Sequence, residues 1–108
     1  MEHIIKRDGK VVAFDSNKIK IAITKAFEST KEVNYTEEEQ ETIINKVIEK
    51  IIALKKDQTI EQIQDTIEKQ LLKTAPMVGK NFLIYRRERT KIRNKKQNAM
   101  IHELIAVK

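Results

Sequence analysis

Three basic residues near the N-terminus are placed to gather around a negatively charged ligand. Lys6 and Arg7 directly precede an Asp8-Gly9 pair, and Lys18 follows where an apolar helical period begins. Polyphosphates are bound by several converging cations, because water competes for each phosphate oxygen. If the turn and the helix start lie side by side, these residues form an anion site. The alternative is that the same cations only keep a small domain in solution.

The Asp8-Gly9 pair predicts how this segment folds. Asp-Gly between two β-prone runs is the strongest short hairpin signal, because a type I′ turn needs positive φ at both central residues. We therefore expect a two-residue turn, which places Arg7 opposite Lys10. The same register places Lys6 opposite Val11. The cations then lie at the tip of the hairpin.

A second basic cluster lies toward the C-terminus and includes Arg86, Arg87, Arg89, Lys91, Arg93, Lys95 and Lys96. If the predicted helix that carries them packs beside the hairpin, Arg87 and Lys91 are the members we expect to reach a phosphate. Such a cluster also suits a nucleic-acid backbone, which binds cations through counterion release. Against that alternative, no zinc finger or aromatic-rich sheet accompanies the cluster, and residues 37–41 are strongly acidic.

The sequence gives little support for a catalytic function. The chain has no cysteine, which excludes disulfides, thiolate metal sites and nucleophilic thiols. His3 and His102 lie at opposite ends, so they form neither a metal pair nor a nucleophile–base pair. Gly9 and Gly79 stand alone, whereas a P-loop needs glycines followed by Gly-Lys-Ser/Thr. We therefore expect a non-catalytic domain.

Composition sets the size and class of the protein. The chain has 108 residues, 40% hydrophobic and 35% charged, with a net charge of +6. This length fits one domain with a modest core. The charge favours anionic partners in general. No apolar run of membrane-spanning length and no export signal is visible, so we expect a cytoplasmic protein without a membrane partner.

The apolar periodicity predicts an α+β, mostly helical fold. We expect a first helix over residues 16–30. A second helix should begin at a capping box at Thr36, and a third at a capping box at Thr59. Pro76 opens a fourth helix through Ile92, and the pattern loosens from residue 94. A β-hairpin, with a short third strand at 58–60, then caps a small four-helix bundle. We take 3–96 as the domain and 97–108 as a linker or the start of a further domain.

Three segments resemble one known family. They are the opening Lys6–Asp15 with Lys18-Ile19, the run Thr59–Gln64, and the run Tyr85–Arg89. Together they resemble an ATP-cone, a small nucleotide-sensing domain at the N-terminus of many ribonucleotide reductases and in a transcriptional repressor of their genes. The resemblance covers residues 3–93. It implies ATP or dATP, with Mg²⁺, as the effector, bound by the cations Lys6, Arg7 and Lys18.

The resemblance also marks residues for the adenine. They are Ile4 and Ile5 on the first strand, with Thr59 and Gln64 near the third helix. Ordinary core packing explains the two isoleucines and Thr59 equally well. A common family pattern has a histidine at about the position of Gln64 and an acidic residue near Val12, and this chain has neither.

The family further implies allosteric control of a ribonucleotide reductase, with ATP permitting activity and dATP promoting an inhibited assembly. Partners would then be the catalytic domain or another subunit of the reductase, and further copies of the cone. The basic run Tyr85–Arg93 is similar to that of the anaerobic class, which reduces ribonucleoside triphosphates. The repressor is the alternative parent, but the four cysteines of its zinc ribbon are missing. Nucleic-acid binding is the alternative from another class.

Overall fold

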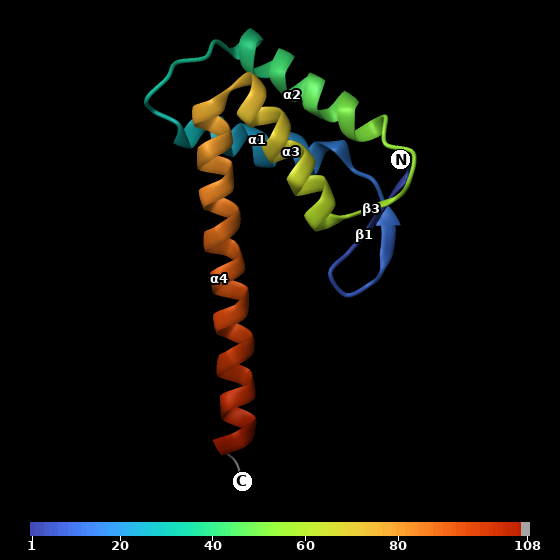
Figure 1. Ribbon diagram of the computed structural model, residues 1–108, viewed down its shortest axis with the longest axis vertical. Coiled ribbons are helices and arrows are strands. Elements are labelled where there is room, and N and C mark those ends of the chain that lie inside the picture. Colours follow the sequence, from blue (N-terminus) through green and yellow to red (C-terminus); the bar gives the residue numbers. More distant parts are fainter. Residues whose placement is uncertain (107–108) are drawn as a thin grey trace.

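A small three-stranded sheet lies at one side of the protein. The computed structural model describes the backbone of residues 1–106 and the side chains of residues 1–95. Strand β1 (His3–Ile5) pairs antiparallel with β2 (Val11–Ala13) and parallel with β3 (Gln58–Thr59), which gives the order β2-β1-β3 (Figure 1). The expected third strand is therefore confirmed. It brings the chain after residue 57 next to the N-terminal hairpin.

The predicted register of the hairpin is wrong by one residue. Ile5 pairs with Val11, and the Lys6 amide donates to the Lys10 carbonyl at 2.8 Å, so Lys6 lies opposite Lys10. The Gly9 amide donates to the Lys6 carbonyl at 2.9 Å, which closes a three-residue loop over residues 7–9. Only Gly9 has positive φ, at 86°. A three-residue loop needs one such residue, whereas a type I′ turn needs two.

Capping residues define where three of the helices begin, and two of these caps were predicted. Helix α1 (Ser16–Ser29) is capped by Asp15, whose carboxylate accepts from the Asn17 amide. Helices α2 (Glu37–Ile52) and α3 (Ile60–Thr74) each begin with a complete capping box, at Thr36 and at Thr59. These boxes satisfy amides at the start of the helix that have no partner within it. The α3 cap is also the residue that ends β3, so it fixes the helix to the sheet.

The apolar faces of all four helices meet in one core. Its fully buried members include Ile23 of α1, Val47 and Ile51 of α2, Leu71 of α3 and Val78 of α4. Helices α3 and α4 approach closely at Gly79, where an added Cβ would lie 2.7 Å from the Leu72 backbone nitrogen. The expected α+β fold, a small sheet beside a four-helix bundle, is confirmed.

Helix α4 (Pro76–Ala106) is much longer than the other helices. Proline is favoured at the first position of a helix, because its missing amide has no partner there. The pattern predicted loosening from residue 94, but the helix continues to Ala106, well beyond the other helices (Figure 1). That residues 97–108 lead to another domain stays a prediction, and 107–108 lie outside the described chain. No helix within residues 1–106 has the length and apolarity to cross a bilayer.

Candidate functional site

A cleft of about 630 Å³ lies between the hairpin and helices α1, α3 and α4. Sites for small organic ligands have similar volumes. Each wall comes from a different part of the chain, and the parallel pairing of β3 with β1 brings these parts together. The fold therefore forms this cleft only when the sheet and the bundle are both in place.

The cleft has an apolar floor. It is formed by Ile4 of β1, Val12 of β2, Phe14 of the segment between β2 and α1, and four residues of three helices, Ile19, Ile63, Ile67 and Phe82. The four helix residues among them are buried and continue into the core. Gln64 adds one amide, which carries both a donor and an acceptor. Such a floor suits a flat, mostly apolar group with polar edges, such as a nucleobase.

Basic side chains line the rest of the cleft. Six cations contribute, Lys6, Arg7, Lys18, Arg86, Arg89 and Arg93. Asp15 is the one acidic residue of the lining, and its carboxylate already accepts from the α1 backbone at 3.0 Å. The excess of positive charge makes the cleft a site for an anion, because a cleft lined by charges of one sign focuses their field on a ligand of the opposite charge.

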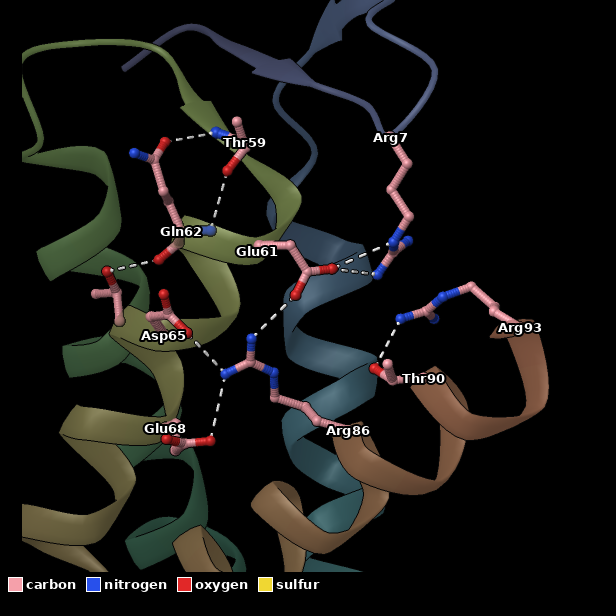
Figure 2. Close-up of polar contacts among 10 residues, drawn as sticks. Arg7, Thr59, Glu61, Gln62, Asp65, Glu68, Arg86, Thr90 and Arg93 are labelled. Atoms are coloured by element: carbon pink, nitrogen blue, oxygen red, sulfur yellow. Dashed lines mark hydrogen bonds and ion pairs between the residues drawn. The ribbon is translucent and has the colours of Figure 1, made fainter. Parts of the chain in front are cut away.

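Arg86 fixes α4 to α3. It donates to Asp65 at 2.9 Å, to Glu61 at 3.1 Å and to Glu68 at 3.3 Å (Figure 2). Its side chain is only 17% exposed. Burial alone would lower the pKa of Arg86, but the hydrogen bonds to Asp65 and Glu61 outweigh burial and raise it. Arg86 therefore stays charged and shapes the cleft wall.

Glu61 also ties the hairpin to the helices. Its Oε1 accepts from Arg7 Nε at 3.2 Å and from Arg7 Nη2 at 3.0 Å, while its Oε2 faces Arg86 (Figure 2). Burial by itself would raise the pKa of Glu61. Hydrogen bonds from Arg86 and then from Arg7 outweigh that effect and hold its pKa below the ordinary value. Glu61 is therefore a carboxylate at neutral pH.

Other cations of the cleft have no such partner. Among residues 1–95, Lys6, Lys18 and Arg89 form no ion pair, and Arg93 donates to the Thr90 hydroxyl at 3.0 Å. Unpaired cations keep their donors for a ligand, whereas a cation held by a carboxylate must exchange partners first. Within the described side chains, the unpaired cations are therefore the readiest phosphate ligands.

The structure brings together some of the predicted site residues. Those that line the cleft are Ile4, Lys6, Arg7, Lys18 and Gln64. Ile5 and Thr59 line a smaller neighbouring hollow of about 510 Å³, which shares Lys6, Arg7 and Arg93 with the cleft. The Thr59 hydroxyl is also engaged as the α3 cap, at 3.1 Å from the Gln62 amide.

Arg87 and Lys91 line neither hollow among the described residues. Lys91 is 77% exposed and lies 4.0 Å from Glu88. The cleft instead receives Arg86, Arg89 and Arg93, which the sequence reasoning did not select. The helical periodicity of the sequence could have identified these arginines. Steps of four, three and four residues from the buried Phe82 lead to all three of them on one helix face.

Comparisons with known proteins show the family of this chain. The ATP cone domain model matches residues 2–91. A vitamin B12-dependent ribonucleoside-diphosphate reductase of Thermoplasma acidophilum is 37% identical over 103 residues, which cover 90% of this chain and 13% of that protein. A ribonucleoside-diphosphate reductase subunit alpha of Chlamydia pneumoniae is 36% identical over 104 residues, 88% of this chain and 10% of the relative. The chain thus spans about a tenth of these relatives. It belongs to the ATP-cone family of nucleotide-binding regulatory domains.

Proposed function

We propose that this domain binds ATP and dATP in the cleft and controls the overall activity of a ribonucleotide reductase. One observation carries the proposal: a single cleft combines an apolar floor with six cations and one engaged acid. The apolar floor suits a purine, and the cations suit a polyphosphate. The family and the reductases among its relatives support the same reading.

In this proposal the base lies on the floor between the strands and α3, where the Gln64 amide reaches its polar edge. The phosphates lie toward Lys6 and Lys18, with Arg89 and Arg93 completing the rim. Mg²⁺ would arrive with the phosphates, because no group of three or more acidic or histidine side chains in the described part of the chain is arranged to hold a metal.

Regulation would depend on the 2′-hydroxyl that distinguishes ATP from dATP. One buried hydrogen bond made or lost is worth about 1–3 kcal/mol, enough to separate the two ligands. By linkage, an inhibited assembly that forms with dATP must bind dATP more tightly than the free domain does. We propose that this assembly involves other copies of the cone or a reductase subunit, in the cytoplasm.

The parent enzyme is a separate question. Its prediction as a ribonucleoside-triphosphate reductase is not confirmed, because the relatives above are diphosphate reductases. We propose a ribonucleotide reductase as parent, and these relatives favour the diphosphate class. The catalytic chemistry would lie outside this chain.

Calorimetric titration of the 108-residue chain with ATP, dATP, GTP and a short DNA duplex tests the proposal. We expect saturable binding of ATP and dATP, weaker binding of GTP, and duplex binding only at low salt. Duplex binding that is tighter than ATP binding and falls steeply with salt would instead identify a nucleic-acid-binding domain. Absence of ATP and dATP binding would refute the proposed function.

A further inference from the structure

The Glu61 carboxylate is held by two arginines at the edge of the cleft. Its carboxylate lies between the hairpin and α4, where Arg7 donates to Oε1 and Arg86 donates to Oε2 (Figure 2). Both arginines line the cleft, and Arg7 and Glu61 also line the smaller hollow beside it. The carboxylate therefore uses donors that face the space proposed for the ligand.

Guanidinium groups bind carboxylates and phosphates with the same planar set of donors. Arg7 points both Nε and Nη2 at one oxygen of Glu61, at 3.2 and 3.0 Å. While this contact persists, those donors are not available to a phosphate. A ligand must take them from Glu61 or bind without them.

The two arginines differ in how readily they can exchange. Arg86 is 17% exposed and is also held by Asp65 and Glu68, so it keeps two carboxylates if Glu61 leaves. Arg7 is 42% exposed, and Glu61 is its one acidic partner within residues 1–95. Exposed ion pairs are weak, because water competes for both partners. Arg7 is therefore the member that can be exchanged.

We propose that the Glu61 carboxylate is an internal competitor of the ligand's phosphates for Arg7. This inference rests on the proposed function, which supplies the phosphates. In the ligand-free state Glu61 holds Arg7 and thereby fastens the hairpin to the start of α3. A phosphate that takes Arg7 releases this fastening, so Glu61 lowers the affinity and sets the nucleotide concentration at which the cleft fills.

Isothermal calorimetry with ATP on the whole chain tests this. Glu61→Gln removes the competitor and is expected to tighten ATP binding by about twofold to fivefold, the range that an exposed ion pair provides. Asp65→Asn is the matched control, because it removes the same charge one turn along α3 and contacts Arg86 but not Arg7. We expect a smaller gain for this control.

A change of charge near the cleft would also attract ATP, so a double-mutant cycle is needed. In an Arg7→Ala background, Glu61→Gln no longer frees Arg7, and its advantage over Asp65→Asn should disappear. Glu61→Asp provides an independent test that keeps the charge while withdrawing the carboxylate, and it should also tighten binding. It serves in place of Glu61→Gln if circular dichroism shows that the latter is misfolded.

The outcomes separate the inference from the proposed function. If the unmodified chain binds no nucleotide, both are refuted. If it binds ATP but Glu61→Gln gains no more than Asp65→Asn, the competitor role alone is refuted. A gain that persists unchanged in the Arg7→Ala background would also refute it, because the effect would then come from charge alone.

Discussion

Replacing Gly79 with alanine sets a steric clash between two helices against the higher helix propensity of alanine. Gly79 is buried at the end of the first turn of α4, where this helix crosses the end of α3. An added Cβ would lie 2.7 Å from the Leu72 backbone nitrogen and 3.0 Å from the Leu71 carbonyl carbon. These are backbone atoms within a helix, so they cannot rotate away as a side chain would. The two helices would have to separate.

The two contributions can be compared. Alanine in a helix interior is more stable than glycine by about 1 kcal/mol. Overpacking a buried contact costs about 1–3 kcal/mol, and a clash with backbone belongs at the upper end of that range. With an overpacking cost of about 2–3 kcal/mol and a gain in helix propensity of about 1 kcal/mol, we expect Gly79→Ala to lower the free energy of unfolding by about 1–2 kcal/mol.

Urea unfolding followed by circular dichroism measures the change. Lys80→Ala is the matched control, because Lys80 is the exposed neighbour on the same helix and should change stability by no more than about 0.5 kcal/mol. Gly79→Ala should also weaken ATP binding, since α3 and α4 form two walls of the cleft. A Gly79→Ala protein more stable than the original would show that helix propensity prevails and that the close approach is not needed.

Three further results are expected. Lys6→Ala and Lys18→Ala should each weaken ATP and dATP binding by about tenfold, since a charged hydrogen bond contributes about 1.5 kcal/mol or more. Lys46→Ala on α2 is the control and should leave binding unchanged. If calorimetry shows unchanged affinity for the Lys6 and Lys18 variants, these lysines are not part of the site. Asn81→Ala removes a 2.8 Å hydrogen bond to a buried threonine hydroxyl at the end of α1 and should lower the free energy of unfolding by about 1 kcal/mol, and an unchanged urea midpoint would contradict this. The pKa of Glu61 is lowered on folding, so the stability that Glu61 contributes is present above the ordinary pKa of 4.5 and is lost as pH falls through the folded pKa. Glu61→Gln should therefore make the urea midpoint less sensitive to acid. Identical pH profiles of the urea midpoint for the two proteins would contradict this prediction.

Local signals predicted most of the fold. The capping boxes at Thr36 and Thr59 are each contained in four residues, and both helices begin there. The predicted register of the hairpin was wrong, because an Asp-Gly pair fits a two-residue loop and also a three-residue loop that ends in glycine. The difference lies in the φ of Asp8, which no sequence pattern states.

The site was predicted less well than the fold. The cations of the hairpin and of α1 were found because they surround one short motif. To select the arginines of α4 that face the cleft, one must know which face of the helix is buried, and the buried Val78 and Phe82 define that face. Measured from Phe82, Arg86 and Arg89 share the face of the cleft, while Arg87 and Lys91 turn away from it. The ion pair of Arg7 with Glu61 joins residues far apart in the chain, so local spacing could not predict it.

The unbroken course of α4 gives the cleft a mechanical lever. At 1.5 Å per residue, the part of this helix from Arg93 to Ala106 is about 20 Å long. A helix transmits a tilt along its whole axis, so a slight rotation at the arginines becomes a larger sweep at the far end. If a bound ligand tilts α4 against α1 and α3, on which the helix packs, the far end of α4 moves farther than the arginines do.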